Sequence, residues 1–200
     1  MAADIGDNVS MHYYANMLLL GDGIPVNKEE VIKYIKMPIR NGNLVSMRIY
    51  GYMLQYGEGV EVNKEEAVNY YKMAIKGGDP PAMNNYTVIL EDGDGVSINP
   101  EKAVKYYKMA IEKGNVEAMH NYGFMLYDGK GVEVNKEESA KYFKMSADFG
   151  FVKGMCNYVE MLLSGYRVAL NKEEGKQIRQ NGRKRRSNCI EQLRLRTLQR

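Results

Sequence analysis

The sequence predicts an all-α protein, a solenoid of helix–turn–helix repeats with a period of 36 residues. Three ladders of identical residues carry this prediction: Gly21, Gly57, Gly93, Gly129 and Gly165; Asn27, Asn63, Asn99, Asn135 and Asn171; and Tyr14, Tyr50, Tyr86, Tyr122 and Tyr158. A fixed period of this length is typical of stacked repeats rather than of one wound core. Such arrays present an extended surface, so a binding function is expected rather than chemistry.

The period divides the chain into seven segments. They are the end of an incomplete repeat (1–7), four full repeats (8–43, 44–79, 80–115 and 116–151), a partial fifth repeat (152–175) and a basic tail outside the pattern (176–200).

The first helix of the second repeat is expected from Leu44 to Tyr56. Small and apolar residues share one helical face there, at i, i+3, i+4 and i+7: Met47, Tyr50, Gly51 and Leu54. Gly57 follows, and glycine relieves the strain of the left-handed conformation at a helix C-terminus. This helix is therefore expected to end at the glycine.

The second helix of the same repeat is expected to begin after Asn63, a strong N-cap residue that contributes ~1 kcal/mol. Glu65 and Glu66 fall in the first turn, where the helix dipole favours negative charge, and Glu66 can complete a capping box. A glycine turn after Lys76 ends the helix. Each repeat therefore reads as helix, glycine loop, helix and glycine turn.

Two other repeats vary this pattern. In the third, Pro100 takes the first helical position, where its missing N–H has no intrahelical partner, and Lys102 breaks the capping box. In the first, Pro38 stands where the second repeat has Ala74. Because an interior proline removes a helical hydrogen bond, this helix is expected to kink or end early.

Both ends of the chain interrupt the array. Residues 1–6 are in phase with residues 145–150, so the chain begins inside the second helix of an incomplete repeat. At the other end the pattern stops at Gly175. With suitable codons, a one-base shift there restores a repeat-like sequence, so we hypothesise that the tail is a frameshifted repeat forming a disordered extension.

Charge separates the tail from the body. Residues 176–200 hold nine lysines and arginines and one acid, which leaves 19 basic and 24 acidic residues in 1–175. The basic run 183–186 could serve localisation or nucleic-acid binding. An acidic body argues against nucleic acid as a partner, since phosphate affinity needs a basic contact surface.

The cysteines, the N-terminus and the apolar runs of the sequence indicate the cellular compartment. Cys156 and Cys189 give no disulfide framework, which fits a reducing compartment. The N-terminus shows no signal peptide and no apolar run approaches the length of a membrane span. We expect a soluble, cytoplasmic protein that does not contact a membrane.

Candidate catalytic and metal-binding residues fail on closer reading. The Asp92–Gly95 loop lacks the spaced ligands of a calcium loop, and the paired glycines of the loops follow no strand. His120 and Cys156 occupy equivalent positions, yet two ligands do not make a zinc site. With two histidines in the chain, no catalytic constellation is found. We therefore expect no enzyme activity, no metal and no cofactor.

The fourth repeat carries a pattern that resembles a known family. It reads Ala118-Met119-x-x-Tyr122-Gly123-x-x-Leu126-Tyr127-x-Gly129-x-Gly131-Val132-x-x-Asn135, then Ala140-x-Tyr142-Phe143-Lys144-Met145. This is similar to the SEL-one-like repeat (SLR) family, a relative of the tetratricopeptide repeats, over residues 1–174. The resemblance implies an α/α right-handed superhelix that acts as an adaptor in protein complexes. Known members act in membrane-protein degradation, in cell-cycle and kinase signalling, and in bacterial host interactions.

A partner-binding stripe is expected on the first helices, which line the concave face in tetratricopeptide-like solenoids. Its candidate residues vary between repeats: His12, Asn16, Arg48, Tyr52, Asn84, His120 and Phe124. The row through His120 also includes Cys156, and this row is read as polar surface. Tyr52 and Phe124 would be binding anchors, or else would pack against the neighbouring repeat. The second-helix tyrosines, Tyr34, Tyr70, Tyr106 and Tyr142, are read as core.

The resulting hypothesis is a non-enzymatic scaffold or adaptor that holds a protein or peptide on its concave face. The alternative is a fragment of a larger repeat-containing signalling protein, for example one with a kinase domain, that has lost its catalytic part.

Overall fold

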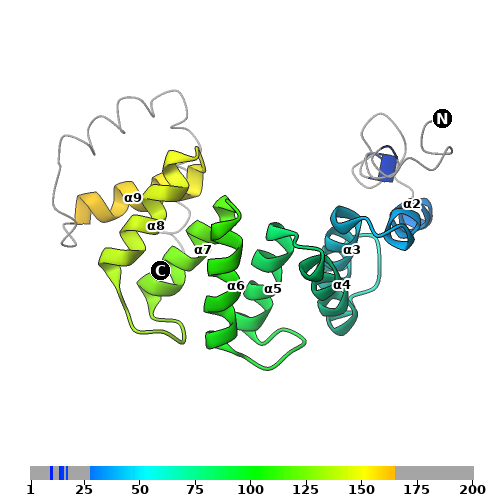
Figure 1. Cartoon of the computed structure of the whole chain (residues 1–200), viewed down its shortest axis with the longest axis horizontal. Helices are drawn as coiled ribbons and strands as arrows, with labels where there is room; N and C mark the ends of the chain where they lie inside the picture. Colours follow the sequence, from blue (N-terminus) through cyan, green and yellow to red (C-terminus); the bar gives the residue numbers. More distant parts are fainter. Residues whose placement is uncertain (1–9, 11–13, 16, 18–27, 165–200) are drawn as a thin grey trace. The chain divides into compact units, whose positions relative to one another are not determined.

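The computed structural model describes residues 28–164 together with Ser10, Tyr14, Ala15 and Met17. Eight helices are assigned in this part of the chain, and no strand (Figure 1). They are α2 (Lys28–Arg40), α3 (Leu44–Tyr56), α4 (Lys64–Lys76), α5 (Pro80–Asp92), α6 (Pro100–Glu112), α7 (Val116–Asp128), α8 (Lys136–Asp148) and α9 (Val152–Ser164). The all-α repeat prediction is confirmed, and so is the predicted extent of α3.

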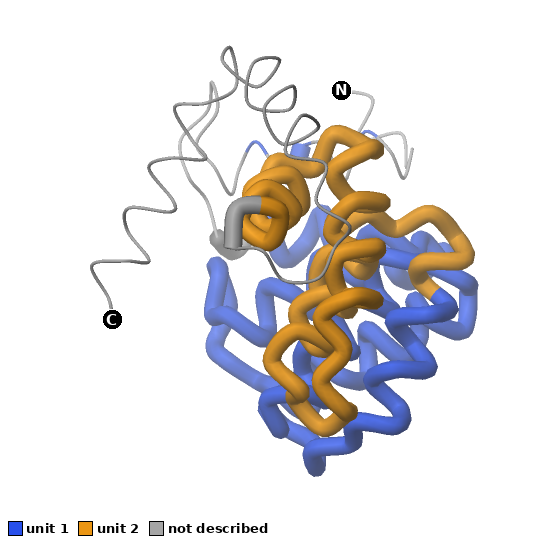
Figure 2. Tube along the Cα trace, turned by 90° about the vertical axis from the view of Figure 1, so that its left-hand side faces the viewer, with its two compact units in different colours: residues 1–109 blue, residues 110–200 orange. Residues whose placement is uncertain are grey.

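The chain forms two compact units, residues 1–109 and residues 110–200 (Figure 2). In the first unit, α3 packs against α4, α2 against α3, and α4 against α5. In the second unit, α7 packs against α8 and α8 against α9. Within each unit, sequence neighbours are therefore also neighbours in space, as expected of stacked repeats.

Side-chain caps set where the helices begin. The Oδ1 atom of Asn63 accepts from the backbone N–H of Glu66 at 3.1 Å, which confirms the predicted N-cap. The predicted capping box takes another form, because the Asn63 N–H donates to the Leu54 carbonyl. Glu66 Oε2 instead accepts from Asn63 Nδ2 at 3.2 Å. In the third repeat Asn99 still caps Lys102 at 2.9 Å, without a carboxylate there.

Glycine ends the first helices for a conformational reason. Gly57 lies at φ +75° and its N–H donates to the Met53 carbonyl at 2.8 Å, closing the last turn of α3. A side chain would also be excluded there, because an added Cβ would lie 2.9 Å from Val62 Cγ2. The predicted glycine stop is thus confirmed, and the loop that follows packs back onto it.

Pro38 does not shorten its helix, so the expectation of an early end is wrong. α2 runs for 13 residues, the same length as α4, which has Ala74 at the equivalent position. Pro38 lies in the last turn of α2, and its carbonyl accepts from the N–H groups of Asn41 and Asn43, both at 3.0 Å. The helix end is therefore closed by bonds to the proline carbonyl, which does not need the missing N–H.

Tyrosines and lysines join the helices in a repeated way. In each of three repeats a first-helix tyrosine meets a second-helix tyrosine edge-on: Tyr50–Tyr70 at 4.9 Å, Tyr86–Tyr106 at 5.4 Å and Tyr122–Tyr142 at 4.8 Å between ring centroids. A lysine of the preceding repeat lies over the first-helix ring: Lys36 over Tyr50, Lys72 over Tyr86 and Lys144 over Tyr158. The second-helix tyrosines were expected in the core. Tyr34 is buried there, whereas Tyr70 is half-buried.

Candidate functional site

The structure separates the predicted stripe residues by their exposure. His12 and Asn16 lie outside the described residues. Arg48 and Phe124 are half-buried, and Tyr52 is exposed. Asn84, His120 and Cys156 are buried, with exposed fractions of 8%, 6% and 7%. The reading of their row as polar surface is wrong at these three positions.

His120 is buried because aromatic rings surround it. Its ring centroid lies 5.1 Å from Phe124, 5.7 Å from Phe143 and 5.3 Å from Phe151. Asn157 Nδ2 donates to His120 Nε2 at 2.9 Å, and Nδ1–H of the ring donates to Asn121 Oδ1 at 3.2 Å. Both ring nitrogens are therefore satisfied inside the second unit, which fits a packing role for this histidine.

Phe124 belongs to the same cluster. Its ring lies 5.3 Å from Phe143 on α8, and it packs against the buried group that holds Tyr158 and Met161. Phe124 thus follows the packing alternative rather than offering an exposed anchor. Tyr52, at the equivalent position two repeats earlier, is 40% exposed, and its role as a binding anchor stays a prediction.

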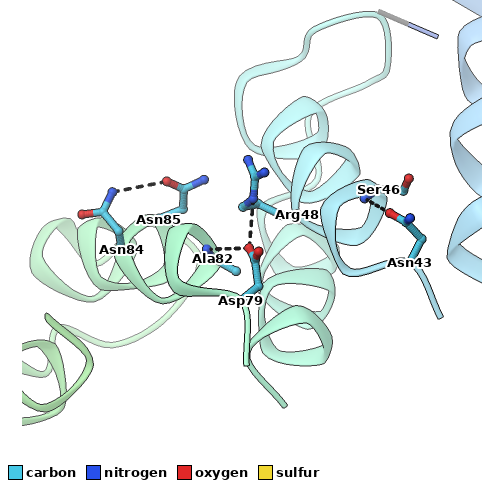
Figure 3. Close-up of polar contacts among 7 residues, drawn as sticks. All are labelled: Asn43, Ser46, Arg48, Asp79, Ala82, Asn84 and Asn85. Carbon is cyan, nitrogen blue, oxygen red and sulfur yellow. Dashed lines mark hydrogen bonds and ion pairs between the residues drawn. The ribbon is translucent and has the colours of Figure 1, made fainter. Parts of the chain in front are cut away.

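Arg48 is fixed by an ion pair. Its Nε lies 2.9 Å from Asp79 Oδ2, which joins the middle of α3 to the start of α5 (Figure 3). The same carboxylate oxygen accepts from the backbone N–H of Ala82 at 3.0 Å and so caps α5. Asn84 and Asn85 follow on α5, with Asn84 Nδ2 donating to Asn85 Oδ1 at 3.4 Å (Figure 3). Asp79 was missed in the sequence, although its position before two prolines is a helix-start signal.

Tyr52 and Tyr56 form an exposed aromatic pair on α3. Their ring centroids lie 4.6 Å apart with an angle of 48° between the planes. Tyr56 is 54% exposed, and it was not among the predicted residues. Its spacing of four from Tyr52 was the available signal, because residues i and i+4 are neighbours on a helix surface. Arg48, Tyr52 and Tyr56 therefore lie along one line of α3.

The groups around the pair are acidic. Burial, and after it the Glu58 carboxylate, raise the pKa of the Tyr52 phenol. Burial also raises the pKa of Tyr56, followed by Tyr52 and by the carboxylates of Asp94, Asp92 and Glu58. These carboxylates belong to the loop after α3 and to the end of α5 and the loop after it. We define Tyr52, Tyr56, Glu58, Asp92 and Asp94 as the α3 aromatic patch.

The described part of the chain has neither a cluster of metal-ligating side chains nor a membrane-spanning helix. Among the described residues, no three His, Cys, Asp or Glu side chains come together as a metal site. Cys156 is not a free thiol, contrary to the sequence reading, and Cys189 lies outside the described residues. No helix in the described part is long and apolar enough to cross a membrane.

Comparisons with known proteins agree with this fold. A family model described as Sel1 repeat matches residues 8–37, 44–79, 80–115 and 116–150. A Sel1 repeat protein from Oxalobacter formigenes is similar with a TM-score of 0.80 and 22% identity, over 89% of this chain and 74% of that chain.

A second similar structure is c5321, described as a protective antigen of uropathogenic Escherichia coli strains with an SLR fold. It has a TM-score of 0.76 and 22% identity over 88% of this chain and 38% of that chain. No curated protein matches the sequence. None of these matches supports the alternative of a lost kinase or other catalytic domain. The repeat pattern, the helical solenoid and the family model agree, and the chain belongs to the Sel1 repeat family.

Proposed function

We propose that this protein is a non-enzymatic scaffold whose first helices hold a protein or peptide partner. Sel1 repeat proteins are in general protein-interaction scaffolds, which gives the class of function. The observation that supports a specific surface is the exposed pair Tyr52 and Tyr56 on α3. Tyrosine and arginine are, with tryptophan, the residues enriched among binding anchors, and Arg48 lies on the same line of the helix.

The surface is held rigid by contacts that do not involve a partner. Asn43 caps α3 through the N–H of Ser46 at 2.8 Å, and Gly57 closes its end. Arg48 is fixed by Asp79 before any partner arrives. A preorganised surface loses little side-chain entropy on binding, so more of the contact energy appears as affinity. Of the predicted stripe, we retain Arg48 and Tyr52 as partner contacts. His12 and Asn16 stay predictions.

A capture experiment tests the scaffold function. The immobilised protein, its Arg48→Ala/Tyr52→Ala variant and a Met73→Ala control are compared by quantitative mass spectrometry of bound proteins. Met73 is 47% exposed on α4 and serves as an exposed apolar residue outside the patch. A partner held by the wild type and the control should be lost from the double variant, with unchanged helicity by circular dichroism. Equal capture by all three proteins rules out this surface, and lost helicity shows that the two residues support the fold.

A further inference from the structure

We propose that Arg48 binds the side-chain carboxylate of an aspartate or glutamate in the partner protein. This inference rests on the proposed scaffold function and names the chemistry that the partner brings to α3. It follows from a guanidinium group that is held by one nitrogen and leaves its terminal nitrogens without a partner.

Arg48 is engaged on one edge of its guanidinium group. Its Nε lies 2.9 Å from Asp79 Oδ2, and this is the one ion pair that it makes among the described residues. Of its side-chain nitrogens, Nε is the one that is closed off from solvent. The terminal nitrogens point away from Asp79 (Figure 3), and no hydrogen bond joins them to a described residue. Because the side chain is 24% exposed, a ligand can reach these nitrogens.

The open edge of the guanidinium group has the shape that a carboxylate requires. Its terminal N–H groups form a planar fork that donates parallel hydrogen bonds to both oxygens of one carboxylate. Asp79 holds the plane of this fork before a partner arrives, so little side-chain entropy is lost when a carboxylate binds. The fork is therefore a preorganised donor for an acidic group.

Basic residues gather at the end of the first unit where α3 and α5 begin. Arg48 is the one charged residue of α3, and α5 has no charged residue before its last two. The end of α4 lies beside the start of α3, since a Cβ added at Gly77 would overlap the side chain of Leu44. Lys76 is thereby brought to this end, and Arg40 closes α2 shortly before α3 begins. The ion pair of Arg48 is neutral, so these cations and the positive ends of the helix dipoles make the surroundings attractive to an anion.

The acidic groups lie at the other end of the same helices. Tyr56, the last residue of α3, is about 12 Å along the helix axis from Arg48, and Glu58 follows it. Asp92 ends α5, about 18 Å from the start of that helix. Both distances exceed the length of about 8 Å over which physiological salt screens exposed charges. The carboxylates of the α3 aromatic patch therefore oppose a carboxylate at Arg48 only weakly.

A side-chain carboxylate fits this place better than two other anions. The C-terminal carboxylate of a peptide is captured by unpaired backbone N–H groups. At the starts of α3 and α5 the side-chain caps already accept from such groups. A nucleic acid would carry its line of phosphates past Arg48 toward the acidic ends of these helices, where it is repelled. One acidic side chain meets the fork and brings no further negative charge.

Tyr52 indicates what lies beside the acidic residue in the partner. It follows Arg48 by four residues, so the two side chains are neighbours on the surface of α3. Its ring is 40% exposed and can pack against an apolar side chain of the partner. The expected segment therefore places an aspartate or glutamate next to an apolar residue.

Selection from a displayed peptide library tests the proposal with the full chain. Random peptides are fused through their C-termini to a phage coat protein, so that their carboxylates are all on side chains. Peptides held by the wild type should be enriched in aspartate or glutamate beside an apolar residue. Arg48→Gln should remove the acidic enrichment. Arg40→Gln is the matched control, because it removes an exposed arginine at the end of α2, and it should retain the enrichment.

Fluorescence anisotropy with one selected peptide then measures the contact itself. Replacing the acidic residue of the peptide by its amide should raise the Kd for the wild type about tenfold. The same replacement should leave the Kd for Arg48→Gln unchanged, because the two groups contact each other. Arg48→Lys keeps the charge and loses the fork, so its Kd should lie between those of the wild type and Arg48→Gln. The change in the peptide leaves the protein intact, so it separates binding from folding.

Three outcomes would overturn the proposal. They are no acidic enrichment with the wild type, the same enrichment with Arg48→Gln, or selection only from a second library that is displayed through its N-termini and offers free C-terminal carboxylates. If the partner in the capture experiment is nevertheless lost from Arg48→Ala/Tyr52→Ala, the scaffold function stands and only the carboxylate chemistry is wrong.

Discussion

The phenol of Tyr107 donates a hydrogen bond to Glu91 Oε2 at 2.6 Å and thereby joins α6 to the end of α5. Tyr71 and Gln55 make the same contact in the second repeat, at 2.9 Å. The fourth repeat has Phe143 and Tyr127 at these positions, and Tyr127 packs against the cluster that holds Phe143. In the fourth repeat, aromatic packing thus replaces the hydrogen bond, and the two helices of the repeat still contact each other.

Removing the Tyr107 hydroxyl should be costly. A hydrogen bond to a carboxylate contributes about 1.5–3 kcal/mol, so Tyr107→Phe should lower the free energy of unfolding in urea by about this amount. In a Glu91→Ala background, Tyr107→Phe should lower the free energy of unfolding by less, because the hydrogen bond between the two side chains is already absent. Equal costs in both backgrounds would show that the bond contributes nothing.

Two substitutions of Asp79 should distinguish the stability that comes from its helix cap from the stability that comes from its ion pair with Arg48. Asp79→Asn keeps an acceptor for the Ala82 N–H and loses the charge that pairs with Arg48, at a cost below ~1 kcal/mol. Asp79→Ala loses both contacts and should cost ~1 kcal/mol more in urea unfolding. The interpretation fails if asparagine and alanine are equally destabilising.

Alanine substitutions at Gly114 and Gly129 should distinguish the cost of backbone strain from the cost of side-chain crowding. Both have positive φ, +80° and +70°. An added Cβ at Gly114 would meet nothing within 4 Å, whereas at Gly129 it would lie 2.5 Å from Val134 Cγ2. Gly114→Ala should cost about 1–2 kcal/mol from the left-handed conformation alone. Gly129→Ala should cost more, and Val134→Ala should remove part of that excess; equal unfolding midpoints for the two single variants would contradict this.

Alkaline pH should destabilise the second unit through Tyr122. Burial, followed by Glu138 and Tyr142, raises the pKa of this phenol from 10.0 to about 12. The fold thus favours the neutral form, and its stabilising contribution is complete below the unfolded pKa and lost as pH rises toward the folded one. Urea midpoints measured between about pH 9 and pH 12 should fall, and fall less steeply in Tyr122→Phe. An identical pH slope in the variant would assign the effect to other groups.

Local features of the fold could be read from the sequence because they depend on residues close in the chain. The Oδ1 atom of Asn63 accepts from the backbone N–H of Glu66, three residues later in the chain. The N–H of Gly57 donates to the carbonyl of Met53, four residues earlier, and closes the end of α3. Pro38 was misjudged because the effect of a proline depends on how the helix end is closed. Here its carbonyl accepts two turn bonds, a detail of the turn geometry rather than of composition.

The candidate site could be predicted only in part. The repeat register put Arg48 and Tyr52 in the predicted stripe, and the structure shows one half-buried and the other exposed. Their partners were not predicted: Asp79 shares its repeat position with the N-caps Asn43 and Asn115, but its pairing with Arg48 depends on how α3 and α5 pack. Tyr56 had no equivalent tyrosine in the other repeats. The burial of His120 was also missed, since it depends on Phe143 of α8 and on Phe151 in the turn before α9.

The sequence by itself determined the period, the family and the boundaries of α3 and α4, because caps, glycine stops and apolar spacing act within one or two turns. Only the tertiary structure decided which equivalent positions face solvent. Tyr52 is 40% exposed, whereas Phe124, at the same repeat position, is half-buried against His120 and Phe143. The physical reason is that exposure depends on the side chains that other helices bring to a position, and these differ between repeats that share one backbone plan.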